Sequence, residues 1–316
     1  MEGYPLQSFS TVSDSGKSSP IKSPGSLAPP PQISAASWAI VNVGTGDCIS
    51  SKNSGSIKDI ASLTKIMTLF VVKQCLRHNL VSGQDIVKVP REAVLLGGTT
   101  ANLRHNDLIK LIDLLYGLML PSGNDAAYTL ADYCGAHMLK DPRVNKKKSS
   151  LNPVGFFIKQ MNVWAKHLRL KNTMFLNPHG LSHLGNHSTA IEISKLASLL
   201  IKRQFIETIV STPKYSCLIE NAGISRNLNW VNTNLLLGFE GVTGFKTGRT
   251  HTAGPCLCVT FKNDKVGLCV TLLNSRTPEK RWTEARKLYD WAVTQLESNF
   301  EKIRKNRNLA NFINSG

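Results

Sequence analysis

Strand-like and helix-like patterns are segregated along this chain, and their order is the strongest constraint on its fold. Two short strand-like runs come first, at 38–44 and 48–50, and three more come late, at 239–246, 254–261 and 265–273. Between them, apolar residues recur with the three- to four-residue spacing of amphipathic helices. Early and late strands can share one sheet only if the helical stretch is inserted between them. The sequence therefore predicts an α/β fold of the α+β kind: an antiparallel sheet flanked by helices, an inserted, mostly helical lobe, and a cleft between them.

Composition suggests where this folded region begins and ends. Residues 1–33 are rich in Ser, Pro and Gly, and we expect them to be disordered. One domain is expected over 34–297, with its helical lobe at roughly 63–190, followed by a basic tail at 298–316. Helices are expected at 62–77, 106–119, 124–138, 156–168, 189–203 and about 282–297, and an exposed loop at 141–155.

The formal charge of +17 raises the question of a nucleic-acid or anionic-membrane partner. The two basic clusters, 146–148 and 302–307, have no interleaved aromatic residues. We therefore interpret the charge as solvated loop and tail residues and expect no nucleic-acid partner. No apolar run approaches the ~18 residues of a membrane span, and the N-terminus shows no signal-peptide pattern.

Seven cysteines, an odd number, are scattered through mostly apolar segments. This distribution favours buried reduced thiols over a disulfide framework.

The chemistry is indicated first by Ser62-Leu63-Thr64-Lys65, at the start of a strongly apolar helical pattern. One helical turn places Lys65 on the same face as Ser62. A serine hydroxyl needs an adjacent base, and a lysine acts as one only when uncharged. The reference pKa of lysine is about 10.4, and bringing it near neutrality disfavours the ammonium by about 4 kcal/mol. Burial and a second cation such as Lys246 would do this. Taken alone, the pattern also fits a capping serine followed by a surface lysine.

Two further motifs follow in order along the chain. Ser122-Gly123-Asn124 lies on a loop that enters a helix; Asn124 offers a donor and an acceptor to a substrate amide, and Ser122 is suited to relay a proton. Lys246-Thr247-Gly248 ends a predicted strand, where the glycine lets the backbone approach a ligand. The next amide, that of Arg249, and the amide of Ser62 are suited to form an oxyanion hole. Each motif alone also fits an ordinary turn or helix cap.

Together these motifs are the combination found in penicillin-binding proteins and class A β-lactamases. The chain resembles the low-molecular-weight penicillin-binding proteins, the D-Ala-D-Ala carboxypeptidases of peptidase family S11, and so their β-lactamase/transpeptidase-like fold. The resemblance covers about 34–297 and extends to longer segments, among them IASLTKIMT, LLYGLMLPSGNDAA, MNVWAKHLRLKNTMFLNPHGL, NTNLLL and GVTGFKTGRTHTAGPCL.

The resemblance implies that a peptide ending in D-Ala-D-Ala acylates Ser62 and that β-lactams act as covalent inhibitors. Lys65 and Ser122 would be catalytic with it. The substrate would be bound by Asn124, Lys246, Thr247, Gly248, Arg249 and Arg281, the last in the place of a family arginine that holds the substrate carboxylate. Arg281 also fits a surface arginine beside a helix.

Three functions remain open from the sequence: a D-Ala-D-Ala carboxypeptidase, a β-lactamase-like hydrolase of another substrate, and a binder of muropeptides without catalysis. No glutamate is identifiable as a deacylating base, which argues against the second. The complete Ser62, Lys65 and Ser122 set argues against the third.

No cofactor or metal is expected. His179, His183 and His187 are spaced four residues apart, as metal ligands on a helix would be. Pro178, Gly180 and Gly185 interrupt any helix there, and no acidic partner is near in the sequence.

Overall fold

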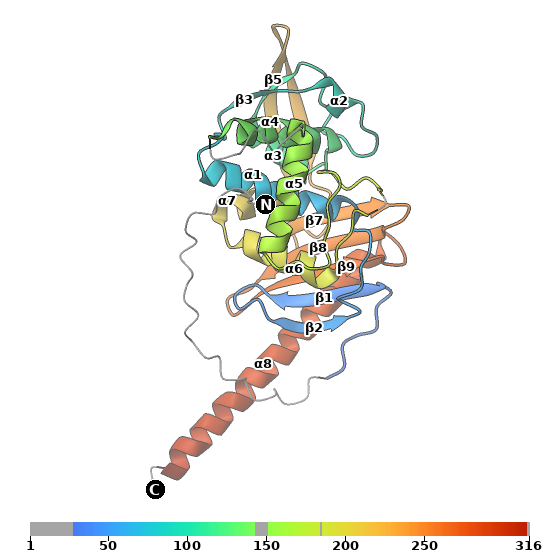
Figure 1. Cartoon of the computed structure of the whole chain (residues 1–316). Helices are drawn as coiled ribbons and strands as arrows, with labels where there is room; N and C mark the ends of the chain where they lie inside the picture. Colours follow the sequence, from blue (N-terminus) through green and yellow to red (C-terminus); the bar gives the residue numbers. More distant parts are fainter. Residues whose placement is uncertain (1–27, 143–150, 184, 315–316) are drawn as a thin grey trace.

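The computed structural model describes residues 28–142, 151–183 and 185–314 (Figure 1). Its central element is a five-stranded antiparallel sheet in the order β2-β1-β9-β8-β7. The strands are β1 (Ser37–Asn42), β2 (Cys48–Lys52), β7 (Val242–Thr250), β8 (Gly254–Lys262) and β9 (Gly267–Leu273). The two N-terminal strands thus join the three late ones, as the sequence predicted, and β1 pairs directly with β9.

Helices cover both faces of this sheet (Figure 1). One face packs on α8 (Lys280–Asn314) through a buried cluster that includes Trp38, Ile40 and Leu288. The other face joins the main core beneath α6 (Ala190–Ile201) and α7 (Gln204–Ser211). Alternate side chains of each strand enter the two clusters because successive residues of a strand point to opposite faces.

Most of the segment between β2 and β7, apart from α6 and α7, builds the second lobe. It contains the short 3-10 turn η1 (Ala61–Thr64) and helices α1 (Lys65–Arg77), α2 (Arg91–Val94), α3 (Leu111–Met119), α4 (Asn124–Lys140) and α5 (Pro153–His167). It also contains a second antiparallel sheet, which the sequence did not predict, made of β3 (Ile86–Lys88), β4 (Leu108–Lys110), β5 (Lys214–Asn221) and β6 (Ile224–Val231). The β5–β6 hairpin projects from this lobe, at the top of Figure 1.

Two further expectations need correction. Cys48 is exposed, whereas the other six cysteines are buried, and all seven are free thiols. The last helix continues to Asn314 instead of ending near 297, and it extends away from the body of the molecule (Figure 1). The segment 298–314 contains neither Gly nor Pro, so no residue in it stops the helix.

The predictions of disorder over 1–33 and of a loop over 141–155 fall partly on residues outside the described ranges. The loop prediction is wrong for its last three residues, because α5 begins at Pro153, where Asn152 caps the helix and proline suits the first helical position. Within those ranges, no helix is both long and apolar enough to span a bilayer.

Candidate active site

Ser62 lies in η1, at the junction that leads into α1. The preceding Ala61 has a positive φ of 48°. Two glycines from distant segments, Gly180 and Gly248, lie directly against the backbone of this turn. A methyl group on Gly180 would lie 2.0 Å from the Ala61 carbonyl oxygen, and one on Gly248 would lie 3.0 Å from the Ser62 amide nitrogen. The absence of both side chains lets the backbone of the 177–183 loop and of β7 close around the nucleophile.

Lys65 is fully buried at 0% exposure and directs its amine at Ser62. Its Nζ lies 2.9 Å from Ser62 Oγ, 2.7 Å from Asn124 Oδ1 and 2.7 Å from the His179 carbonyl oxygen. Burial and the charge of Lys246 lower the pKa of Lys65 well below its usual value, while Asp125 raises it to a lesser degree. An uncharged amine has two protons and one lone pair. Donation to Asn124 and His179 therefore leaves the lone pair for the Ser62 hydroxyl.

Ser122 and Asn124 come from the turn between α3 and α4. Ser122 has a φ of 64°, and its buried hydroxyl has no hydrogen-bond partner among the described residues. Neither side chain caps α4, whose N-cap is Gly123. Asn124 instead accepts from Lys65 and donates through Nδ2 to the Gly97 carbonyl at 2.7 Å. The Asn124 side chain therefore contacts the candidate site through Lys65, and the helix-cap alternative does not hold.

The sequence predicted that the Lys246-Thr247-Gly248 motif ends a strand. The motif lies instead inside β7, because the strand continues to Thr250. Lys246 is 1% exposed. Burial, together with the charge of Arg281, lowers its pKa to about 7. The Thr247 hydroxyl lies 2.8 Å from that of Thr233, a residue of the connection from β6 to β7.

Arg281 projects from the start of α8 toward β7 and is partly buried. Its Nη1 donates to the carbonyl oxygens of Gly248 and Cys256, both at 3.2 Å, and its guanidinium stacks on Trp282 at 4.4 Å. Burial is the main cause that lowers its pKa. Arg281 is therefore half-buried and not fully solvated, and its contact with a substrate carboxylate stays a prediction. The side chain of Arg249 is exposed, so only its backbone amide remains a candidate for the oxyanion hole.

Comparison with known proteins places this geometry in a family. The peptidase S11 family, described as D-alanyl-D-alanine carboxypeptidase, matches residues 25–141 and 153–277. This chain belongs to the S11 family. It is 31% identical over 265 residues to D-alanyl-D-alanine carboxypeptidase DacF of Bacillus subtilis, covering 84% of this chain and 63% of that relative. It is 30% identical over 284 residues to DacD of Escherichia coli, covering 87% of this chain and 66% of the relative. The chain therefore spans somewhat less than two thirds of these two S11 proteins.

Solved structures of S11 relatives share the fold. The Streptomyces K15 DD-transpeptidase superposes with a TM-score of 0.75 at 31% identity, over 84% of this chain and 100% of the other. Penicillin-binding protein 6B of Escherichia coli superposes with a TM-score of 0.70 at 30% identity, over 84% and 78%. The predicted family and fold are confirmed.

Three residues of this S11 site were missed as site residues from sequence. His179 was weighed only as a metal ligand, yet its carbonyl accepts from Lys65, and burial lowers the pKa of its imidazole to about 3. Asp125 is buried and accepts hydrogen bonds from Thr100 and from the amides of Ala101 and Leu103, which fixes the loop that holds Asn124. Thr233 contacts Thr247. Only Asp125 had a local signal, its place next to Asn124.

A metal is not suggested by the arrangement. Within the described ranges, no group of three or more His, Cys, Asp or Glu side chains gathers as a metal site requires.

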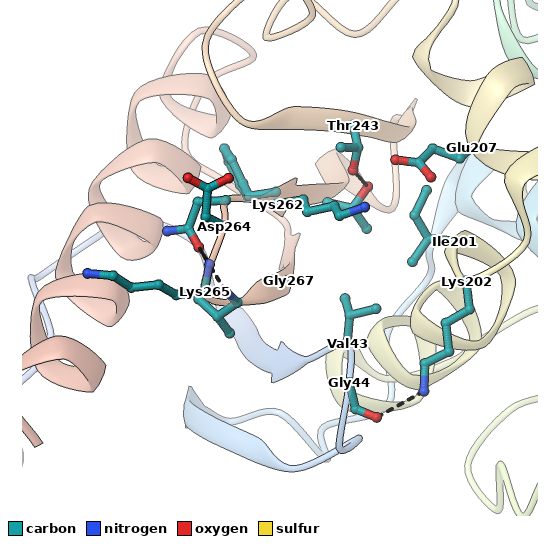
Figure 2. Close-up of a pocket in the computed structure, with 14 residues that line it drawn as sticks. Val43, Gly44, Ile201, Lys202, Glu207, Thr243, Lys262, Asp264, Lys265 and Gly267 are labelled. Carbon is teal, nitrogen blue, oxygen red and sulfur yellow. Dashed lines mark hydrogen bonds between the residues drawn. The ribbon is translucent and has the colours of Figure 1, made fainter. Parts of the chain in front are cut away.

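A cavity of about 440 Å³ lies at the N-terminal end of β7, around Thr243 (Figure 2). Its walls carry Lys202, which donates to the Gly44 carbonyl at 3.0 Å, and a hydroxyl pair in which Thr243 donates to Thr260 at 2.9 Å. None of the predicted site residues lines it.

Proposed function

We propose that this chain is a serine-type D-Ala-D-Ala carboxypeptidase that removes the terminal D-alanine of peptidoglycan-type peptides through an acyl-enzyme at Ser62. The observation that carries the proposal is the 2.9 Å contact between Ser62 Oγ and a fully buried Lys65 amine whose other two partners are both acceptors. None of the three groups that contact the Lys65 amine is a carboxylate, so an ammonium here would have no hydrogen-bonded counter-charge. An uncharged amine, in contrast, can act as the base that activates Ser62.

In the reaction, the Lys65 amine takes the Ser62 proton as Oγ attacks the carbonyl carbon of the penultimate D-alanine. The amides of Ser62 and Arg249 hold the oxyanion of the tetrahedral intermediate. The intermediate collapses by breaking the carbon–nitrogen bond; Ser122 gives its hydroxyl proton to the leaving D-alanine nitrogen and takes the proton held by the Lys65 ammonium, which leaves the amine uncharged. Water then attacks the acyl carbon as Lys65 removes one of its protons. The second tetrahedral intermediate collapses by breaking the bond between the acyl carbon and Oγ, and Lys65 returns its proton to Oγ, which regenerates Ser62.

The cations beside β7 suit a substrate that ends in a carboxylate. Lys246 and Thr247 are neighbours on β7, and Arg281 donates to the Gly248 carbonyl, which adds a third polar group close by. Asn124 is suited to bind the peptide amide. A β-lactam carries both an acylating carbonyl and a carboxylate, so it would acylate Ser62 in the same way and act as a covalent inhibitor.

The test is labelling with a fluorescent penicillin, mass spectrometry of the labelled peptide, and measurement of D-alanine release from diacetyl-Lys-D-Ala-D-Ala. We expect stable label on Ser62 together with D-alanine release, and loss of both in Ser62→Ala. Ser211 and Lys214 have the same spacing as Ser62 and Lys65, but the Ser211 hydroxyl donates to the Thr208 carbonyl within α7 at 3.4 Å, so Ser211→Ala is the matched control and should keep both signals.

Two other results would contradict the proposal. Rapid release of hydrolysed penicillin without D-alanine release would indicate a β-lactamase-like hydrolase. Absence of both label and D-alanine release in the wild-type protein would leave a protein that only binds muropeptides.

A further inference from the structure

The connection from β6 to β7 places a second hydroxyl behind the Thr247 side chain. Thr233 Oγ1 lies 2.8 Å from Thr247 Oγ1, and both side chains are at least partly buried. The position of Thr233 determines what the Thr247 hydroxyl is able to do.

A hydroxyl has one proton to donate and can accept as well. In the free protein either member of the Thr233–Thr247 pair can be the donor. A bound carboxylate accepts only, so Thr247 must turn its proton toward the substrate. The pair then survives only if Thr233 donates to Thr247. A chain of two hydrogen bonds pointing at an anion strengthens each member by polarisation.

Thr233 is held in place by its neighbours along the chain. Its own amide donates to the Leu120 carbonyl at 3.0 Å, two residues before Ser122. Asn232 donates through Nδ2 to the Val210 and Thr212 carbonyls, at 3.2 and 3.1 Å, and accepts from the Asn234 amide at 2.9 Å. The 232–234 segment therefore contacts both the Ser122 turn and β7, and the Thr233 hydroxyl is ordered before any substrate arrives.

We propose that Thr233 is a positioning residue for substrate specificity: it donates to Thr247 and so directs the Thr247 proton at the C-terminal carboxylate of the substrate. This inference rests on the proposed function and adds a residue that favours a carboxylate over an uncharged terminus. A charged acceptor gains about twice as much from such a donor as a neutral one does. Loss of the Thr233 hydroxyl should therefore weaken the binding of substrates that end in a carboxylate more than the binding of uncharged analogues.

The test compares diacetyl-Lys-D-Ala-D-Ala with its C-terminal amide, each as a competitor of fluorescent-penicillin labelling, so that slow turnover of the amide does not matter. Thr233→Val keeps the shape and removes the hydroxyl. We expect Thr233→Val to weaken binding of the carboxylate peptide about fivefold, which corresponds to the loss of one hydrogen bond. The KM for this peptide should rise more than kcat falls. Binding of the amide peptide should change little.

Three variants make the result specific. Thr233→Ser keeps the hydroxyl and should restore selectivity. Thr243→Val removes a hydroxyl from a similar pair on the same strand, the Thr243–Thr260 pair of Figure 2, and should leave selectivity unchanged. In a Thr247→Val background, Thr233→Val should have no further effect, because its action passes through Thr247.

Equal weakening of both peptides by Thr233→Val, or a full effect in the Thr247→Val background, would overturn the inference. The inference would also be overturned if Thr233→Val kept the wild-type preference for the carboxylate peptide over the amide peptide, with an unchanged thermal unfolding temperature. If the wild-type protein neither takes the label nor releases D-alanine, the proposed function itself is wrong. That outcome is distinct from a working enzyme whose selectivity ignores Thr233.

Discussion

Replacing Gly180 by alanine tests how closely the fold must hold the nucleophile. Gly180 has a φ of 87°, a conformation that costs an L-residue about 1–2 kcal/mol. The added methyl group would lie 2.0 Å from the Ala61 carbonyl oxygen, whereas real contacts stay beyond 3.0 Å. The Ala61–Ser62 backbone must therefore move by about 1 Å, and a displacement of that size at a reacting atom costs about 100-fold in rate.

The assay is the second-order rate constant for acylation by a fluorescent penicillin, with thermal unfolding measured on the same samples. Gly185→Ala is the matched control: its φ is 100°, but its methyl group would meet only a flexible Leu176 side chain at 3.0 Å. We expect both variants to lose stability through the positive φ, and only Gly180→Ala to lose about 100-fold in acylation. Wild-type acylation by a folded Gly180→Ala would refute the reasoning.

Other predictions concern the surroundings of the site. Asp125→Ala leaves the buried amides of Ala101 and Leu103 without their acceptor; we expect a loss of about 2–4 kcal/mol in the free energy of unfolding, measured by urea denaturation, and an unchanged value would contradict the assigned contacts. His179 has its pKa lowered from 6.5 to about 3, so the unfolded chain binds its proton first as pH falls. Stability present above pH 6.5 should decline toward pH 3, by up to about 1.4 kcal/mol per pH unit, and His179→Gln should flatten that slope. The Lys246 pKa of about 7 predicts that KM for the carboxylate peptide rises as pH increases through 7, and a KM constant from pH 6 to 8.5 would show that this charge does not bind substrate.

The main sheet was predictable because its strands are short apolar runs bounded by turn residues. The second sheet was not, although β5 and β6 alternate apolar and polar residues around the turn at Ala222 and Gly223, both with positive φ. Their outward residues are mostly Asn, Ser, Lys and Glu, which are typical of loops as well as of exposed strand faces. The pattern from 106 was assigned entirely to a helix, but Leu108–Lys110 forms β4 before α3 begins at Leu111. A short apolar run fits both the two-residue repeat of a strand and the 3.6-residue repeat of a helix.

Within the site, the sequence was informative where a motif fixes local spacing, as with Ser62 and Lys65. It was uninformative where function depends on a carbonyl or a hydroxyl brought from far along the chain. The His179 carbonyl reaches Lys65 across 114 residues of sequence, and Thr233 meets Thr247 through the irregular connection from β6 to β7. Such contacts depend on backbone geometry, and residue type alone does not encode them.

The pH dependence of acylation tests most directly whether Lys65 is the base. The rate constant for labelling by a fluorescent penicillin should be measured from pH 5 to 11. Because burial lowers the Lys65 pKa well below 10.5, the predicted rate rises with pH through a midpoint far below that value and gains nothing further between pH 9 and 11. A rate that keeps climbing about tenfold per pH unit through pH 10, as an ordinary solvated lysine would produce, would contradict the account.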